Sequence, residues 1–137
     1  MVNLETAPKI MAAVHAAITA GLVRACHDLS EGGLGVAAAE MAFAGALGLR
    51  LDLRAVPQTP GLDDTTLLFA ESPSRFLIEL RPHDAPAFEA RLAGLPCARV
   101  GEVTAATELV IVGAAGGEAL RADIGELKSA WQGTVVV

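Results

Sequence analysis

One segment of the sequence, residues 47–54, alternates without exception between leucine and other residue types. Successive side chains of a β-strand point to opposite faces, so this period of two predicts a half-buried strand. Residues 75–81 repeat the pattern, with Phe76, Ile78 and Leu80 on one face. Both segments are therefore expected to be strands of a sheet.

Helical patterns lie between and around these strands. Thr6 can cap a helix that has Pro8 in its first turn and that stops at Gly21. Further helices are expected at residues 34–44, 64–68, 85–92 and 124–131. Short apolar segments predict additional strands at residues 22–26, 97–103, 108–112 and 118–121. Helices alternating with strands, joined by connections of hairpin and helix length, predict an α/β (α+β) fold with a mixed β-sheet packed by helices.

The length and charge of the chain limit its partners. With 137 residues, 53% of them hydrophobic, residues 1–137 are expected to form one domain with one core. The net charge of −6, the missing basic stripe and the 4% of aromatic residues argue against nucleic acid and anionic membranes. No apolar run approaches the roughly 18 residues of a membrane span, and no signal peptide opens the chain. A cytoplasmic protein is expected, with Cys26 and Cys97 as reduced thiols.

The most informative segment is the polar loop from His27 to Gly33, between a predicted strand and a predicted helix. Backbone N–H groups at a helix start have no partner within the helix, and the helix dipole places partial positive charge there. Gly32 and Gly33 would let this backbone approach an anion closely. The alternative is a capped turn in which the glycines only permit a sharp bend. The spacing is neither that of the P-loop nor that of the dinucleotide fingerprint, so both interpretations stay open.

Side chains of the same loop add to this candidate anion site. Ser30 can cap the helix or donate its hydroxyl to a phosphate oxygen. Asp28 and Glu31 could reach a magnesium ion or a ribose hydroxyl, although two carboxylates would repel a bare phosphate. His27, in its neutral form, is expected to orient the loop by donating to a backbone carbonyl. The candidate nucleotide- or phosphate-binding residues are Asp28, Ser30, Glu31, Gly32 and Gly33, and no residue is assigned as catalytic or as a metal ligand.

Four motifs together resemble one known family. They are His27-Asp28-Leu29-Ser30-Glu31-Gly32-Gly33-Leu34 with Ala39-Glu40-Met41 behind it, Leu68-Phe69-Ala70-Glu71-Ser72-Pro73-Ser74-Arg75-Phe76, Val100-Gly101-Glu102-Val103, and Leu127-Lys128-Ser129-Ala130-Trp131. The likeness, over residues 4–131, is to the C-terminal domain of the aminoimidazole ribonucleotide synthetase-like superfamily. Within it, the chain is most similar to the catalytic subunit of phosphoribosylformylglycinamidine synthase. The first two motifs are specific together, though each is weak singly.

The resemblance implies an ATP-dependent ligase of de novo purine biosynthesis. Such a ligase converts formylglycinamide ribonucleotide to the amidine with glutamine-derived ammonia, after ATP has phosphorylated the amide oxygen. It implies ATP or ADP and Mg²⁺ as cofactors of a parent enzyme, and it assigns none to this chain alone. In that family the ATP and magnesium ligands and the catalytic histidine lie mainly in N-terminal-like domains, which this chain lacks. The isolated chain is therefore expected to be inactive.

The resemblance also assigns a place and partners within the parent enzyme. The loop is similar to that of the second, C-terminal copy of the domain, which faces a pseudo-symmetric cleft associated in some members with a structural nucleotide. Glu71, Ser72 and Arg75 match a substrate-contacting segment and are candidate cleft residues, with a surface turn entering a strand as the alternative. Pro73 stands where glutamine is usual. The expected partners are the N-terminal-like domains of the same enzyme and, for a short-form parent, glutaminase and small accessory subunits.

Several other residues invite simpler interpretations. Glu40 could pair with Arg50 or Arg54, or cap a neighbouring loop. Cys26 is expected to be buried, and its side chain should point away from that of His27, because adjacent strand residues face opposite sides. Trp131 is expected to anchor a core or an interface. His15 and His83 have no partner constellation and are expected at the surface.

Two alternatives to the ligase remain open. One is another enzyme of the same superfamily: aminoimidazole ribonucleotide synthetase, selenophosphate synthetase, thiamine-monophosphate kinase or a hydrogenase maturation factor. The other is a non-catalytic module that pairs with a partner domain and only shapes a cleft. The alanine-rich helix at 34–44 and the leucine face of residues 47–53 could supply such an interface.

Overall fold

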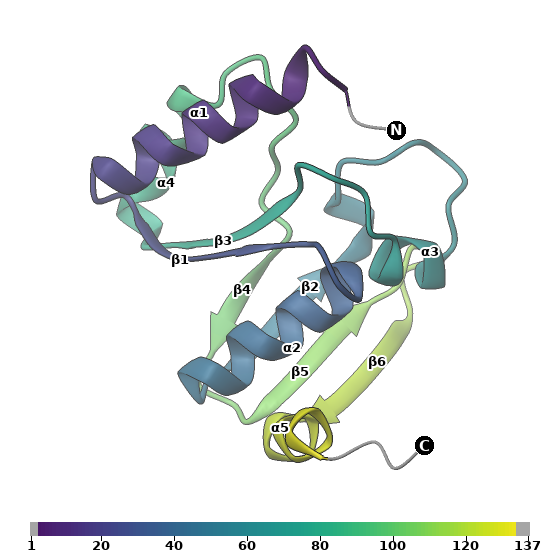
Figure 1. Cartoon of the computed structure of the whole chain (residues 1–137). Helices are drawn as coiled ribbons and strands as arrows, with labels where there is room; N and C mark the ends of the chain where they lie inside the picture. Colours follow the sequence, from purple (N-terminus) through teal and green to yellow (C-terminus); the bar gives the residue numbers. More distant parts are fainter. Residues whose placement is uncertain (1–2, 134–137) are drawn as a thin grey trace.

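Two strands from distant parts of the sequence pair to form a ribbon. The computed structural model of the chain describes residues 3–133 (Figure 1). β1 (Val23–Asp28) and β3 (Phe76–Leu80) form an antiparallel two-stranded sheet. α1 (Thr6–Thr19) and α4 (Ala85–Arg91) lie together over this ribbon (Figure 1).

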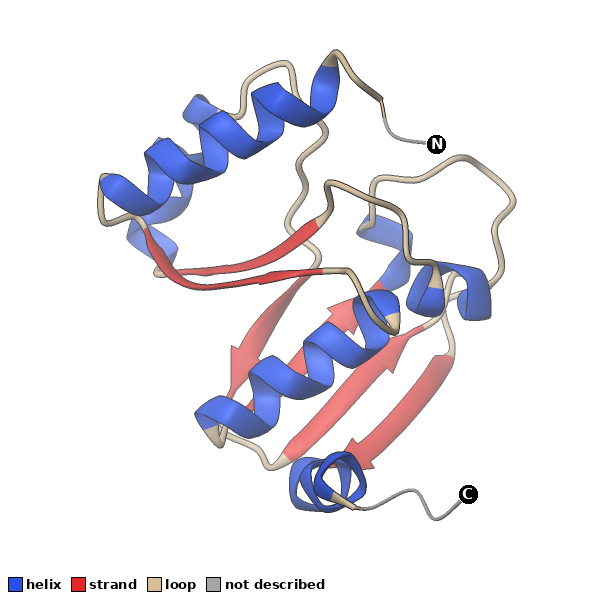
Figure 2. Ribbon diagram, in the orientation of Figure 1, coloured by secondary structure: helices blue, strands red, loops and turns tan. Residues whose placement is uncertain are grey.

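A separate four-stranded sheet forms the other part of the structure (Figure 2). Its strands lie in the order β4 (Gly101–Thr104), β2 (Gly48–Asp52), β5 (Glu108–Val112) and β6 (Glu118–Asp123). β2 and β5 run parallel, whereas the β2–β4 and β5–β6 pairs are antiparallel. The sheet is therefore mixed, and the predicted α+β class is confirmed.

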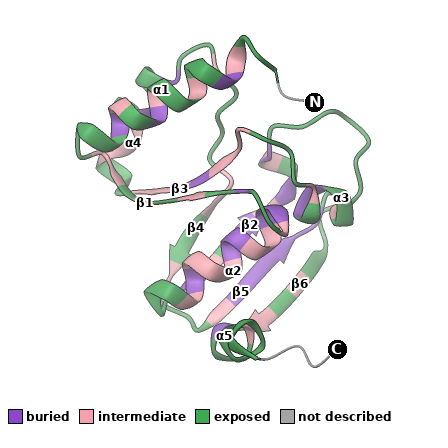
Figure 3. Cartoon of the chain, viewed as in Figure 1, coloured by how far each residue is buried: buried purple, intermediate pink, exposed green. Residues whose placement is uncertain are grey.

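α2 (Gly33–Gly45) lies between the ribbon and the four-stranded sheet, and three of its alanines, Ala37, Ala38 and Ala42, are buried (Figure 3). Small side chains let a helix approach a layer on each side closely, which explains the alanine-rich composition. The main apolar cluster joins these layers and consists of Leu29, Leu34, Ala37, Ala38, Leu51, Leu53, Val56, Leu67, Leu68, Leu77, Leu109 and Ile111. Leu34, Ala37, Ala38, Leu51 and Leu53 belong to this cluster and so pack within the chain instead of presenting an open interface, whereas Leu47 is 45% exposed.

A second apolar cluster lies under α1 and α4. Its buried members are Ala17, Phe88 and Leu92, and Ile78 and Leu80 of β3 pack against them. The apolar side chains therefore gather in two clusters rather than in the one core expected from the length.

The remaining helices are capped by aspartates. α3 (Asp64–Phe69) begins after Asp63, whose Oδ1 accepts a hydrogen bond from the Thr66 N–H at 2.7 Å. α5 (Ile124–Gln132) begins after Asp123, which accepts from two backbone N–H groups. α3 and α5 both pack against α2. No helix among residues 3–133 has the length and hydropathy needed to cross a membrane.

Several element boundaries differ from the prediction, among them those of three strands. The strand predicted at 47–54 ends at Asp52, because the Asp52 carboxylate accepts a hydrogen bond from the Arg54 N–H and starts a 3-10 turn. The strand predicted at 97–103 begins only at Gly101. The strand predicted at 22–26 continues through Asp28, because its pairing with β3 extends that far.

The predicted cap of the first helix is also wrong. The Asn3 side chain, rather than that of Thr6, accepts hydrogen bonds at this end, from the N–H groups of Glu5 and Thr6, both at 3.0 Å. Thr6 is already the first residue of α1.

Candidate functional site

The pairing of β1 with β3 brings the two polar motifs together. Asp28, at the end of β1, lies opposite Phe76, at the start of β3. The Leu29 N–H then donates to the Arg75 carbonyl at 3.0 Å, one step beyond the last strand pair. Because the strands are antiparallel, the chain leaves β1 at the same end at which it enters β3. The loop after β1 and the segment before β3 therefore lie side by side.

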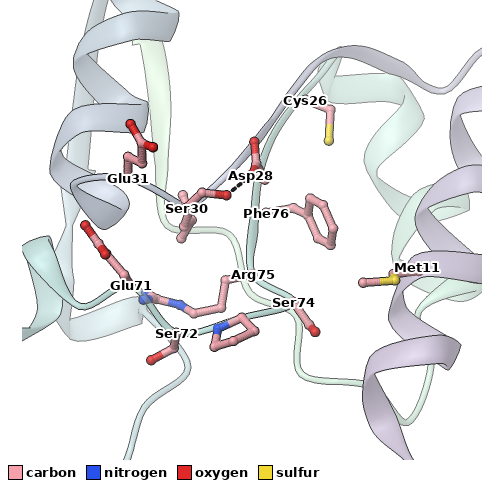
Figure 4. Close-up of a pocket in the computed structure, with 12 residues that line it drawn as sticks. Met11, Cys26, Asp28, Ser30, Glu31, Glu71, Ser72, Ser74, Arg75 and Phe76 are labelled. Carbon is pink, nitrogen blue, oxygen red and sulfur yellow. Dashed lines mark hydrogen bonds between the residues drawn. The ribbon is translucent and has the colours of Figure 1, made fainter. Parts of the chain in front are cut away.

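Between them is a cavity of about 760 Å³ (Figure 4). It is lined by Met11, Cys26, Asp28, Leu29, Ser30, Glu31, Glu71, Ser72, Pro73, Ser74, Arg75 and Phe76. All three predicted cleft residues of the second motif are included, as are Asp28, Ser30 and Glu31 of the first. Gly32 and Gly33 are not among the lining residues.

Gly32 does not present a free amide. Its N–H donates to Oε1 of Glu71 at 2.8 Å, so a carboxylate of the second motif occupies the position expected for a phosphate oxygen. Gly32 is the N-cap of α2, with a left-handed φ of 73°, and no side chain caps the helix. The expectation of an unpartnered amide at this residue is therefore wrong.

Gly33 is buried and packs against the end of α3. Its φ is +63°, and a Cβ atom added there would lie 2.8 Å from the Leu68 carbonyl oxygen and 2.9 Å from that of Ala70. Only glycine allows this approach. Gly33 thus lets the start of α2 contact the backbone just before Glu71.

Asp28 and Ser30 interact with each other at the cavity wall (Figure 4). The Ser30 hydroxyl donates to Oδ2 of Asp28, so Ser30 does not cap α2 as one interpretation predicted. This hydrogen bond holds the pKa of the exposed Asp28 carboxyl below its usual range. Asp28 therefore stays ionised, and the hydroxyl of Ser30 is oriented by its neighbour.

Arg75 supplies the positive charge of the cavity. The side chain is half-buried and extends toward Glu71 and Ser72 (Figure 4). One guanidinium nitrogen donates to the Ala70 carbonyl oxygen at 3.2 Å, and burial lowers the pKa of the group. An arginine keeps its charge even so, and the remaining N–H donors of its guanidinium are available to an anion. The cavity thus combines three carboxylates with one guanidinium.

His27 lies on the opposite face of β1 from Asp28 and points to α2. Its Nδ1 lies 2.6 Å from the Asp28 carbonyl oxygen, which confirms that it orients the loop through a backbone carbonyl. Its Nε2 lies 2.5 Å from Oε2 of Glu40. Burial alone would lower the pKa of His27, but the two hydrogen bonds outweigh it and raise the pKa above its usual 6.5. The protonated imidazole is therefore more favoured here than in a free histidine side chain.

Glu40 has different partners from those expected. Besides His27, its carboxylate accepts a hydrogen bond from the indole Nε1 of Trp131 at 2.7 Å. Arg54 instead pairs with Asp52 at 2.6 Å. Trp131 is 61% exposed and lies against Phe43, with ring centroids 5.6 Å apart, so it anchors α5 to α2 without entering a core.

Six lining residues lie outside the predicted set of site residues: Met11, Cys26, Leu29, Pro73, Ser74 and Phe76. Cys26 was expected to be buried, but it is exposed and shares a face of β1 with Asp28. A predicted strand that continued to Asp28 would have placed Cys26 on the same face as Asp28, because residues two apart in a strand share a face. Ser74 has a left-handed φ of 65°, which is uncommon for a residue other than glycine. Partial desolvation of the thiol and the Asp28 charge raise the pKa of Cys26, which disfavours the reactive thiolate.

Within residues 3–133, no group of three or more histidine, cysteine, aspartate or glutamate residues is placed to hold a metal ion. Both Cys26 and Cys97 are free. The residues that line the cavity therefore do not by themselves fit a magnesium ion.

Fold and cavity together define the chain as an α+β domain in which two polar motifs, joined by an antiparallel ribbon, face a common cavity. The family described as AIR synthase related protein, C-terminal domain, matches residues 1–114, and the chain belongs to this family.

Two curated relatives show the same relationship. The chain is 41% identical to phosphoribosylformylglycinamidine synthase subunit PurL of Deinococcus radiodurans and 36% identical to that of Lactobacillus helveticus, over 133 residues in both cases. These alignments cover 96% and 97% of the chain but 17% of each relative. The chain thus spans about a sixth of the length of the curated relatives it matches.

Solved structures confirm the fold. The crystal structure of phosphoribosylformylglycinamidine synthase II from Thermotoga maritima matches 100% of the chain and 24% of its own length, with a TM-score of 0.84 and 22% identity. T. maritima PurL complexed with ATP matches 93% of the chain and 22% of its own length, with a TM-score of 0.81. The hydrogenase maturation protein HypE of E. coli matches 84% of the chain and 39% of its own, with a TM-score of 0.69.

Proposed function

We propose that this chain is the C-terminal part of a phosphoribosylformylglycinamidine synthase. The whole enzyme would convert formylglycinamide ribonucleotide to the amidine, using ATP and glutamine-derived ammonia. The chain alone would be inactive and would contribute one wall of a cleft that other domains complete. Its loop is more similar to the second copy of the domain than to the first, so we assign the cavity to the pseudo-symmetric cleft.

The observation that carries the proposal is the meeting of the two motifs in one cavity. Asp28, Ser30 and Glu31 come from one motif, and Glu71, Ser72 and Arg75 come from the other. The two curated relatives reported above are PurL subunits. One structural neighbour is T. maritima PurL complexed with ATP.

The charge of each lining residue determines which part of a nucleotide it would contact. Arg75 would contact a phosphate, because its guanidinium is the positively charged group among the lining residues and the other charged groups there are carboxylates. The Ser30 and Ser72 hydroxyls would donate to the same anion, and Asp28 or Glu31 would accept from ribose hydroxyls. Gly32 and Gly33 would act indirectly, by placing Glu71 and the start of α2. ATP phosphates bring Mg²⁺ with them, and the ion would be held mainly by those phosphates and by residues of other domains.

The proposed partners are based on the part of the curated relatives that this chain does not cover. N-terminal-like domains of the same enzyme would close the cavity, and glutaminase and small accessory subunits would join if the parent is the short form. One structural neighbour is described as PurLQS from T. maritima, an assembly with further subunits. We assign the protein to the cytoplasm, as a biosynthetic enzyme without nucleic acid or membrane among its partners.

A domain replacement tests this function. The matching segment of D. radiodurans PurL is replaced by this chain, and ammonia- and ATP-dependent amidine formation is measured. We expect the chimera to be active and Arg75→Ala to lower its activity at least about tenfold, the effect of losing one charged hydrogen bond. Arg91→Ala removes an exposed arginine at the end of α4 and serves as the matched control. A chimera that folds with native thermal stability but makes no amidine would contradict the proposal.

A specific observation favours a second candidate, a cleft-shaping module without ligand contacts. Leu4, Met11 and Ile18 are exposed apolar residues at intervals of seven, and Met11 borders the cavity. A partner domain could cover this side of α1 whether or not the cavity binds a ligand. The chimera distinguishes the two functions. If the chain has only a packing role, the chimera with Arg75→Ala should form amidine as fast as the chimera without it.

A further inference from the structure

Behind the cavity wall, a single carboxylate joins three elements. Oε2 of Glu40 lies 2.5 Å from Nε2 of His27 on β1, and Oε1 of Glu40 accepts the indole N–H of Trp131 on α5 at 2.7 Å. Glu40 itself is on α2. The two partners are 13 and 91 residues away from it in the sequence. The cavity-bearing ribbon and the C-terminal helix are thus connected through one side chain.

The connection continues from His27 to the cavity. Nδ1 of His27 lies 2.6 Å from the Asp28 carbonyl oxygen, so the imidazole fixes the peptide that follows Asp28. The Asp28 carboxylate in turn accepts the Ser30 hydroxyl, and both side chains line the cavity. A carbonyl and a carboxylate both accept hydrogen bonds, so His27 must donate through both nitrogens. Glu40 therefore faces an imidazolium, and the pair is a charge-assisted hydrogen bond.

We propose that Glu40 is a positioning residue of the cavity: through His27 it fixes the Asp28–Ser30 segment, and through Trp131 it couples that segment to the docking of α5. The coupling between the two ends is a property of the chain without ligand. Only its use in binding a nucleotide or substrate rests on the proposed function. The simpler alternative is that Glu40 merely attaches α5 to α2.

The two alternatives differ in what happens at the far end of the network. If Glu40 only attaches α5, loss of the indole N–H affects α5 alone. If Glu40 couples the ends, the same loss weakens the restraint on His27 and loosens the backbone at Leu29. The Leu29 N–H donates to the Arg75 carbonyl at 3.0 Å, so its hydrogen exchange reports opening of this segment.

The first experiment is amide hydrogen exchange of the full 137-residue chain and of Trp131→Phe. Phenylalanine retains an aromatic ring beside Phe43 but has no N–H donor. We expect the Leu29 amide to exchange at least about threefold faster in the variant, a coupling of the size seen in connected networks. The Leu22 amide, bonded to the Ala17 carbonyl at 3.1 Å in the other cluster, should be unchanged. Unchanged exchange at Leu29, or equal acceleration at Leu22, would overturn the coupling.

The second experiment probes the network in the opposite direction. The chain has one tryptophan and no tyrosine, so its fluorescence comes from Trp131. We expect His27→Gln to shift the Trp131 emission, although His27 has no hydrogen bond to the indole. His83→Gln, a histidine beside Asp84 outside the network, should not shift it. Identical emission of His27→Gln and wild type would overturn the inference even if the chimera described above is active, so the two proposals fail separately.

Discussion

Glu71 and Gly32 are 39 residues apart in the sequence, yet the Glu71 carboxylate accepts a hydrogen bond from the Gly32 N–H at 2.8 Å. This bond links the segment before β3 to the backbone amide of Gly32, the N-cap residue of α2. It fills the anion position at that helix end with a carboxylate of the chain itself. The link therefore fixes the two sides of the cavity relative to each other.

Glu71→Ala removes this link. We expect the free energy of unfolding to fall by about 1 kcal/mol, the usual net contribution of one hydrogen bond. Denaturant unfolding followed by circular dichroism measures the change. Glu31→Ala is the matched control, because Glu31 lines the same cavity but has no hydrogen bond or ion pair within residues 3–133. Equal losses for both variants would show that the Gly32 contact contributes nothing.

Gly33→Ala should be among the most destabilising substitutions in the chain. Its cost combines a left-handed backbone with contacts of 2.8 and 2.9 Å to two carbonyl oxygens. We expect a loss of at least about 3 kcal/mol, since the backbone strain alone costs about 1–2 kcal/mol. Gly21→Ala separates the two causes: its φ is +74°, but nothing lies within 4 Å of the added Cβ. A difference in urea midpoint between the two variants measures the collision, and equal midpoints would contradict it.

The His27 pair should make stability depend on pH. The pKa of His27 is raised in the folded chain, so the folded state holds the proton more tightly than the unfolded state. The stabilisation is complete below the usual value of 6.5 and is lost as the pH rises through the higher folded pKa. The stability difference between wild type and His27→Gln should therefore be larger at about pH 6 than at about pH 9. A difference that grows with pH would contradict this assignment, and His83→Gln provides the baseline.

Asp123 caps α5 and should control how firmly that helix is held. Its Oδ1 accepts hydrogen bonds from the Gly125 N–H at 2.8 Å and the Glu126 N–H at 3.1 Å. Asp123→Ala should cost about 1 kcal/mol, the typical effect of losing an N-cap. The Trp131 emission should shift to longer wavelength at lower denaturant concentration than in the wild type. Asp123→Asn keeps a capping oxygen and should behave like the wild type; if it behaves like Asp123→Ala, capping is not the cause.

Local periodicity was sufficient to predict most of the elements. The alternating leucines gave β2, and Phe76, Ile78 and Leu80 gave β3, because one face of each strand is covered. The polar segment from residue 27 to 33 and the segment from residue 71 to 75 were also recognisable as the candidate site. Sequence periodicity predicts an element correctly where the neighbouring residues in the sequence determine whether a side chain is buried.

Long-range pairing was not predictable in the same way. His27 and Asp28 are polar and look like loop residues, but β3 supplies their backbone partners and keeps them in a strand. The error at Cys26 followed from this, because the exposed face of β1 could not be located. Glu40 was expected to pair with Arg50 or Arg54 or to cap a neighbouring loop. Its partners instead come from β1 and α5, and no sequence spacing relates those positions.

The antiparallel register of Asp28 with Phe76 has a mechanical consequence. The two polar motifs that line the cavity are attached to β1 and β3, which are hydrogen-bonded to each other. A twist of this two-stranded sheet therefore moves both motifs in the same direction. Substituting side chains can change what the pocket accepts. Widening its mouth would require breaking backbone hydrogen bonds between β1 and β3, so the strand pairing sets the width of this pocket.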